Sequence, residues 1–158
     1  MERVDLARLL GASTGPGRPR DVTISTAEPA EFMAQFAAGV AAGGAVFVAD
    51  PRWGASEQSQ FSALIDPELR TQNSEPGGSA GWLCLPTGGS SGAVRLARHD
   101  QDTVAAAVQG CRRHFEVERV NAVGVLPLHH VSGLMAWLRC ALTGGRYQPW
   151  AWADLEAG

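Results

Sequence analysis

Apolar runs alternate along the chain with segments of helical periodicity, which predicts an α/β fold. Residues 45–49 (AVFVA) form an unbroken apolar run, as in strands of sheets that are covered on both faces. A short strand is expected at residues 21–25. Between the two, Pro29 opens a segment with apolar residues at helical spacing that stops at Gly43-Gly44. This succession predicts a β-α-β unit with a parallel-type sheet flanked by helices.

The second half of the chain continues the same alternation. Residues 94–98 alternate apolar and polar side chains, which favours a half-exposed strand rather than a helix. Asp100 can cap the helix that follows, since its side chain can accept a hydrogen bond from the first turn. The remaining predicted elements are a strand at 82–85, a helix at 102–115, a buried strand at 121–126, a helix at 130–142 closed by Gly144-Gly145, and a final strand at 146–148.

Two segments rich in Gly, Pro, Ser and other polar residues are expected to be loops. Residues 1–20 combine a short amphipathic piece with a turn-rich connector, and residues 71–81 have the same polar composition. The length of 158 residues suits one domain with one core. We therefore expect a single domain over residues 1–158.

Composition and charge exclude several classes of protein. The net charge of −3 argues against a nucleic-acid-binding surface, which would need a basic stripe. The three cysteines include no C-x-x-C pair, so neither a disulfide framework nor a zinc site is expected from them. The N-terminal residues lack the pattern of a signal peptide, and no apolar window is long enough to span a membrane. A cytoplasmic location is the resulting expectation.

The segment LPTGGSSG, residues 85–92, offers clustered hydroxyls and backbone N–H groups that glycines can turn toward an anion. No Gly-Lys follows, so it is not a P-loop. By spelling it also matches the hydrolase elbow G-x-S-x-G, with Ser90 as nucleophile, Asp100 or Asp102 as acid and His129 or His130 as base. That elbow needs a helix directly after the serine, whereas a strand is predicted there. A plain turn without a ligand is the third alternative.

A second candidate site is PLHHVSG, residues 127–133, which follows a predicted strand and precedes a helix. Ligands of α/β sheets collect beyond the carboxyl ends of strands. Adjacent side chains on an extended backbone point in opposite directions, so at most one of His129 and His130 is expected to reach a pocket. No third ligand lies near them in the sequence, so no metal site is expected.

Together, the two segments resemble the adenylate-forming superfamily of acyl-CoA synthetases, luciferases and peptide-synthetase adenylation domains. LPTGGSSGAVRLARHD is similar to the Thr/Ser/Gly-rich first signature of that superfamily, and PLHHVSGL to its Pro-Leu-Phe-His-x-x-Gly segment. Upstream, residues 28–53 resemble its Pro-Glu-Phe helix, Val-rich strand and Asp/Asn-Pro step. The three matches occur in the expected order over residues 22–150. HVSGLMAWLRCALTGG is especially similar to o-succinylbenzoate–CoA ligases of menaquinone biosynthesis.

The resemblance implies an AMP-forming acid–thiol ligase that needs ATP and Mg²⁺. A carboxylate attacks the α-phosphate of ATP to give an acyl-adenylate and pyrophosphate, and the thiol of coenzyme A then displaces AMP. By position, Arg95 falls near the lysine of the superfamily's Pro-Lys-Gly step, and His130 matches a histidine that borders the acyl pocket, with Ser132 and Gly133 beside it. The residues implied for the phosphates are Thr87, Gly88, Gly89, Ser90, Ser91 and Gly92.

The chain also departs from the superfamily's pattern. Val94-Arg95-Leu96 replaces Pro-Lys-Gly, and the adenine-binding Tyr-Gly-x-Thr-Glu segment and the C-terminal catalytic lysine have no counterpart. We therefore expect an N-terminal fragment or a degenerate remnant, inactive by itself, with its catalytic residues unidentified. The alternative is a non-catalytic α/β binding module. Association into a homodimer through a sheet edge or through Trp137, Trp150 and Trp152 is a further expectation.

Overall fold

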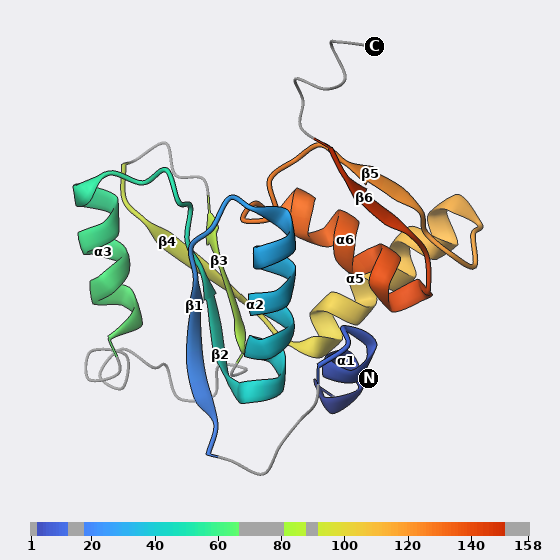
Figure 1. Ribbon diagram of the computed structural model, residues 1–158, viewed down its shortest axis with the longest axis horizontal. Coiled ribbons are helices and arrows are strands. Elements are labelled where there is room, and N and C mark those ends of the chain that lie inside the picture. The colour runs from blue at the N-terminus through green and yellow to red at the C-terminus, as the bar shows by residue number, and fades with distance from the viewer. Residues whose placement is uncertain (1–2, 13–17, 67–80, 88–91, 151–158) are drawn as a thin grey trace.

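The computed structural model describes residues 3–12, 18–66, 81–87 and 92–150. Its main sheet has four strands in the order β1-β2-β3-β4, and a second sheet pairs β5 with β6 (Figure 1). The first three strands run parallel, and β4 is antiparallel to β3. The predicted α/β architecture with a parallel-type sheet flanked by helices is therefore confirmed.

The β-α-β unit forms where the apolar pattern predicted it. Strand β1 (Arg20–Ile24) leads to helix α2 (Pro29–Ala42) and back to strand β2 (Gly43–Val48). Helix α2 starts at its proline, which needs no N–H there. It ends at Gly43, whose φ of 80° is the left-handed conformation that favours glycine. Before this unit, helix α1 (Arg3–Leu9) packs against α2.

Strands β3 (Leu83–Thr87) and β4 (Arg95–His99) form an antiparallel pair on either side of the glycine-serine segment. Thr87 is opposite Arg95 in the register, so both lie where the pair opens. The strand predicted after this segment is thereby confirmed. Residues 88–91, which include four of the predicted phosphate contacts, lie outside the described residues, as do residues 71–80.

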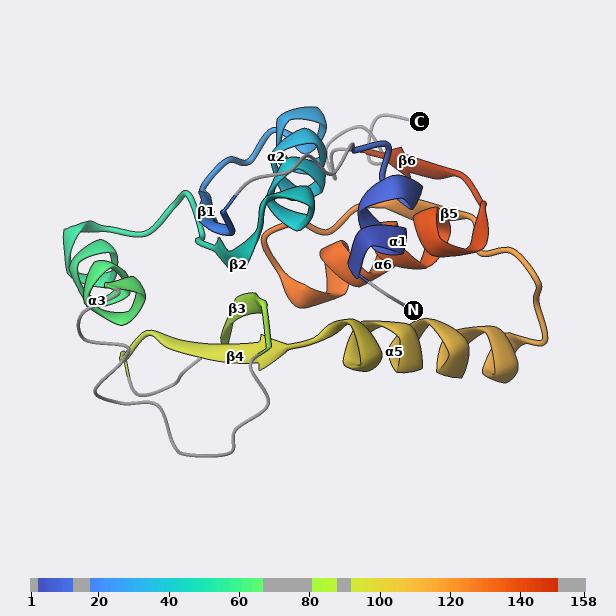
Figure 2. The same ribbon diagram turned by 90° about the horizontal axis from the view of Figure 1, so that it is seen from below.

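Asp100 caps helix α5 (Gln101–Phe115), as predicted: its carboxylate accepts hydrogen bonds from the N–H and the hydroxyl of Thr103. Strand β4 leads directly into this helix, which extends away from the main sheet (Figure 2). Helix α6 (Val131–Thr143) packs against α5 and connects β5 (Ala122–Gly124) to the parallel strand β6 (Tyr147–Pro149).

Both faces of the main sheet are buried because side chains of β2 alternate between two apolar clusters. Val46 and Val48 join the larger cluster, to which helices α1, α2, α5 and α6 contribute, whereas Phe47 packs on the opposite face. There it meets Phe61 from helix α3 (Ala55–Ile65). The sequence pattern did not predict α3, yet this helix covers the second face.

Two expectations for the later part of the chain need correction. The predicted buried strand at 121–126 is only three residues long, and Val123 is 54% exposed, because within the described residues it pairs with β6 alone. Trp137 belongs to the core, with its ring 5.4 Å from that of Phe36, so it cannot contribute to a surface patch. Trp150 is half-exposed, and Trp152 lies outside the described residues.

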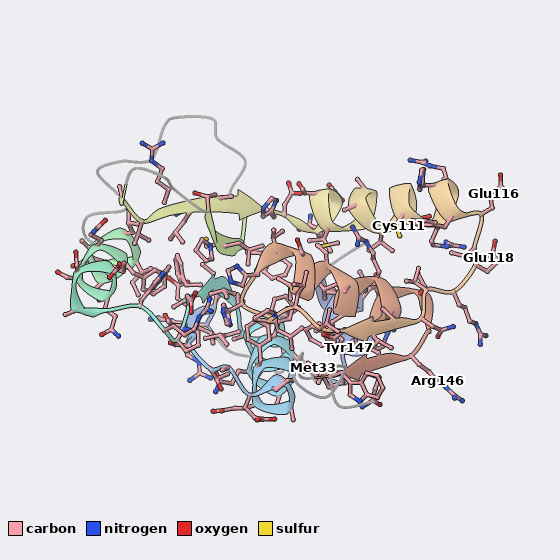
Figure 3. All side chains as sticks on the ribbon, turned by 90° about the horizontal axis from the view of Figure 1, so that it is seen from above. Met33, Cys111, Glu116, Glu118, Arg146 and Tyr147 are labelled. Carbon is pink, nitrogen blue, oxygen red and sulfur yellow. The ribbon has the colours of Figure 1, made fainter. Side chains whose placement is uncertain are left out.

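The space beside Gly124 is filled by the chain's single tyrosine. Tyr147 projects from β6 (Figure 3), and a Cβ at Gly124 would lie within 1.9 Å of its hydroxyl oxygen. Burial raises the pKa of Tyr147 above its usual value of 10.0. In the part of the chain that the structure describes, no helix has the length and apolar character needed to cross a membrane.

Candidate functional site

A pocket of about 290 Å³ opens at the edge of the main sheet where the parallel strands β2 and β3 end. Thr87 stands at the end of β3, Asp50 follows β2, and His130 directly precedes α6. Ligands of α/β sheets bind at this edge, outside the carboxyl ends of the strands. The full set of lining residues is Asp50, Trp53, Glu57, Pro86, Thr87, Gly92, Ala93, Val94 and His130.

Asp50 and Arg52 form a compact ion pair at the rim of this pocket. The sequence Asp50-Pro51-Arg52 turns so that the Asp50 carboxylate accepts from the backbone N–H of Arg52 at 2.9 Å. The guanidinium then donates twice to the carboxylate, from Nε at 3.0 Å and from Nη2 at 2.8 Å. These side-chain hydrogen bonds lower the pKa of Asp50 to about 2, against a smaller opposing effect of burial.

His129 is buried beside this ion pair. Its side chain is 3% exposed, and its Nε2 lies 3.4 Å from Oδ1 of Asp50. Neither ring nitrogen makes a hydrogen bond, although both are shielded from solvent. Burial lowers the pKa of His129, and the attraction of Asp50 opposes this only in part. Burial therefore favours the neutral form of this imidazole, which lies beside the carboxylate.

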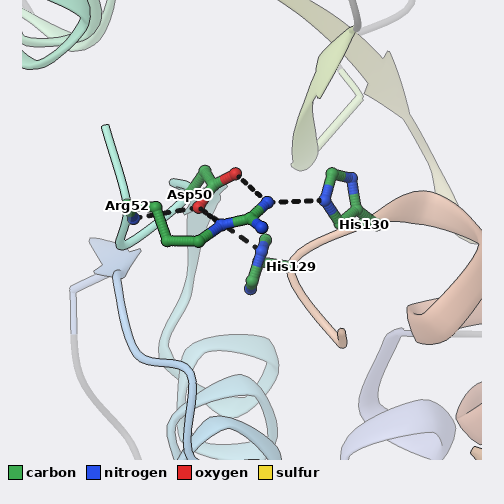
Figure 4. A network of polar contacts seen from close by, with 4 residues as sticks. All are labelled: Asp50, Arg52, His129 and His130. Carbon is green, nitrogen blue, oxygen red and sulfur yellow. Dashed lines mark hydrogen bonds and ion pairs between the residues drawn. The ribbon is translucent and has the colours of Figure 1, made fainter. Parts of the chain in front are cut away.

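His130 is exposed and completes the network (Figure 4). Arg52 Nη2 donates to Nε2 of His130 at 3.3 Å, so this nitrogen is the unprotonated one. The rings of His129 and His130 lie 4.8 Å apart. Of the two, only His130 lines the pocket, as we expected for neighbouring side chains on an extended backbone.

The two described ends of the glycine-serine segment both reach the pocket. Thr87 and Gly92 line it, and Gly92 has a φ of 69°, the left-handed conformation in which glycine has no steric cost. Helix α3 fixes the strand side of this segment: Gln60 accepts from the N–H of Val94 at 2.9 Å and donates to the carbonyl of Gly92 at 3.5 Å.

The other predicted site residues lie around the pocket without lining it. Arg95 is exposed on β4, and Ser132 is exposed in the first turn of α6. Gly133 is buried. A Cβ at this position would lie only 2.2 Å from the carbonyl oxygen of Pro127. Its lack of a side chain lets α6 approach the loop that carries the two histidines.

The geometry does not favour the hydrolase alternative. After the glycine-serine segment the chain continues as a strand, so the strand-turn-helix of a nucleophile elbow does not form. Asp100, one of the two candidate acids, is engaged as the cap of α5.

Sequence reasoning missed the acidic partner of the histidines. Asp50 entered the sequence analysis only within the Asp/Asn-Pro step of the resemblance, and spacing alone gave no third ligand near residues 129 and 130. The fold brings Asp50, His129 and His130 together, with one ligand atom from each inside a group no more than 4.8 Å across. The available signal was the position of Asp50 directly after an apolar strand, where parallel sheets collect functional groups.

No family model and no curated protein matches this chain. Several solved structures do, at low sequence identity. A fatty acid AMP ligase from Legionella pneumophila is similar with a TM-score of 0.68 and 11% identity, covering 99% of this chain and 34% of that one. ATP-bound MatB from Rhodopseudomonas palustris has a TM-score of 0.66 and 16% identity, covering 94% and 38%. The o-succinylbenzoate coenzyme A synthetase from Bacillus subtilis, in complex with ATP and magnesium ion, has a TM-score of 0.60 and 14% identity, covering 98% and 51%.

The chain spans about a third to a half of the length of these structures, while they account for nearly all of the chain. Identities of 11–16% establish the fold alone, because folds host many functions. The chain has an α/β fold with a mostly parallel sheet flanked by helices, and this fold matches part of the N-terminal domain of adenylate-forming enzymes.

Proposed function

We propose that this chain is the portion of an AMP-forming acyl-CoA ligase that holds the phosphates of Mg-ATP next to the carboxylate substrate. One observation carries the proposal: both described ends of the glycine-serine segment, Thr87 and Gly92, line the same pocket as His130. The glycine-serine segment and His130 lie far apart in the sequence. The resemblance alone had assigned the segment to the phosphates of ATP and the histidine to the acyl group.

The chemistry of the pocket suits a phosphate group that carries a magnesium ion. Thr87 supplies a hydroxyl, Gly92 leaves open space, and Arg95 sits opposite Thr87 on the neighbouring strand. The backbone N–H groups of residues 88–92 would be the principal donors. Among the lining carboxylates, Asp50 is already paired with Arg52, and the Mg²⁺ of Mg-ATP would offset the charge of Glu57.

The size of the pocket supports a site for the phosphates alone, with the other substrate groups bound elsewhere. A volume of about 290 Å³ is at the lower end for small-molecule sites, which hold drug-sized ligands in roughly 300–1,000 Å³. It suits a di- or triphosphate better than a whole nucleotide with an acyl group. The adenine site, the coenzyme A site and the residues that transfer the acyl group would then lie elsewhere in a complete enzyme. His130, Ser132 and Gly133 would border the acyl group, and an o-succinylbenzoate-like aromatic acid is the proposed substrate.

Isothermal titration of the 158-residue chain with Mg-ATP and with Mg-pyrophosphate tests this proposal. We expect weak binding of both ligands, since the phosphates alone would be held, and no thioester formation. Replacing Gly89 by Val together with Ser90→Ala should abolish binding, because a bulky side chain obstructs the approach of phosphate. The matched control is Gly110→Ala on α5, a glycine outside the pocket with open space around it. Binding that survives the double substitution would show that this segment is an ordinary turn.

A further inference from the structure

A second ligand site is indicated by the polar network at the rim of the pocket. Asp50, His129 and His130 each present one ligand atom to a common space, and the three atoms lie within 4.8 Å of one another. We propose that these three residues bind a divalent transition-metal ion such as Zn²⁺, and that the guanidinium of Arg52 occupies this cation site until the ion displaces it. This site is separate from the Mg²⁺ that accompanies ATP.

The orphaned histidine is the observation that points to a ligand. The side chain of His129 is only 3% exposed, and both of its ring nitrogens lack a hydrogen-bond partner. Buried polar atoms are almost always satisfied, because leaving one unpaired costs most of its desolvation penalty. A metal ion at Nε2 would supply the missing partner on the side that faces Asp50.

The distances fit a tetrahedral ion. Metal–ligand bonds of about 2.0–2.2 Å at tetrahedral angles separate neighbouring donor atoms by roughly 3.3 Å. Nε2 of His129 and Oδ1 of Asp50 are 3.4 Å apart, so this pair already has the required spacing. The group as a whole spans up to 4.8 Å, and His130 is exposed, so its ring can turn inward to close the set.

The ligand types select the class of ion. Two imidazoles and one carboxylate suit Zn²⁺ and the neighbouring transition metals, whereas Mg²⁺ and Ca²⁺ prefer oxygen donors throughout. Three protein ligands leave at least one coordination position for water or for a bound anion. Because Asp50 and His130 both line the pocket, an ion between them would border the space proposed for the phosphates.

Arg52 marks the place of a positive charge in the absence of the ion. Its guanidinium contacts two of the three ligand residues, donating to Asp50 at 2.8 Å and to His130 Nε2 at 3.3 Å (Figure 4). Its side chain is 68% exposed, so it can leave toward solvent without crossing the core. The guanidinium end of the pair is exposed and would be solvated by water when it leaves, and the ion would replace its positive charge beside Asp50.

Titration of the folded chain with Zn²⁺ alone, followed by calorimetry and by the visible spectrum of a Co²⁺ substitute, tests the site without ATP. We expect one ion per chain and a tetrahedral Co²⁺ spectrum. His130→Ala, at an exposed position, and Asp50→Asn should each weaken binding by about tenfold or more, as expected when a coordinating or supporting group is lost. Arg52→Ala should tighten binding, because the competing cation is gone.

Two substitutions control for adventitious binding by other side chains. His114→Ala removes an exposed histidine of α5, and Cys111→Ser removes a partly exposed thiol. Neither should change the affinity for Zn²⁺. The proposal is overturned if no stoichiometric binding is found, or if His130→Ala leaves the affinity unchanged. An unchanged or weaker affinity of Arg52→Ala would overturn the displacement of the guanidinium. Because ATP is absent, these outcomes are independent of the proposed phosphate site.

Discussion

Gly133 offers the sharpest test of how α6 positions the histidine loop. It lies in the first turn of α6, and a Cβ placed on it would lie 2.2 Å from the carbonyl oxygen of Pro127 and 2.6 Å from that of Leu126. Both contacts are with backbone, so no flexible side chain can yield. Replacing Gly133 by Ala must therefore push the helix and the loop apart.

The size of the effect follows from two opposing contributions. Overpacking costs about 1–3 kcal/mol, and a contact this short with backbone belongs at the upper end. Alanine's better helix propensity offsets roughly 0.5–1 kcal/mol. We expect a net loss of about 2 kcal/mol in the free energy of unfolding, or roughly 4–8 °C in Tm for a chain of this size.

Gly110→Ala is the matched control for this substitution. Gly110 also lies in a helix, α5, but nothing comes within 4 Å of a Cβ there. Alanine should stabilise the chain at this position by roughly 0.5–1 kcal/mol through propensity alone. Urea unfolding followed by circular dichroism measures both variants. If Gly133→Ala proves as stable as the wild type while Gly110→Ala behaves as expected, the close approach of α6 to the loop is refuted.

Two further predictions concern the stability of other parts of the fold. Because the pKa of Tyr147 is raised in the folded chain, its contribution to stability is complete below the unfolded pKa of about 10 and is lost as pH rises through the folded pKa. Tyr147→Phe should therefore flatten the alkaline loss of stability in urea unfolding, and the phenolate absorbance of the wild type should titrate above pH 10 until urea restores the ordinary value. Asp100→Ala removes the cap of α5 and should cost about 1 kcal/mol, read from thermal unfolding; Asp102→Ala, which leaves that cap intact, should cost much less.

The apolar pattern predicted the β-α-β unit because a strand that is buried on both faces has an unbroken run of apolar residues. Strand β2 contributes side chains to two clusters, and its apolar run shows this without a structure. The same inference was wrong for residues 121–126, where Val123 and Leu126 are about half exposed. An apolar run shows that a strand has side chains suited to burial, but it does not show whether other described residues pack against them.

Helix α3 escaped prediction because its sequence is mostly polar. Phe61 is its one buried residue among the eleven of Ala55–Ile65, so the periodic signal of an amphipathic helix is weak. The helix is nevertheless essential to the site. It covers Phe47 on the second face of the sheet and, through Gln60, holds the residues that follow the glycine-serine segment.

The network at the pocket rim depends on how the two sheets pack, which no periodicity encodes. Arg52 follows a strand of the main sheet, whereas His130 follows a strand of the second sheet 78 residues later. Each position is individually predictable as the end of a strand. Their contact is not, because it is fixed by the burial of α6 residues such as Leu134 and Leu138 against the core shared with α2.

Arg52 connects the two proposed ligands of the pocket. In the structure its guanidinium is held by the Asp50 carboxylate, which largely neutralises its positive charge. An ion bound by Asp50, His129 and His130 would release that guanidinium beside a pocket proposed to hold phosphates, and the ion itself would add positive charge at the rim. Both changes favour an anion, and coupling between two binding sites is reciprocal. Metal and phosphate should therefore each strengthen the binding of the other. By binding the metal, the buried His129 would then raise the affinity of the neighbouring pocket for phosphate.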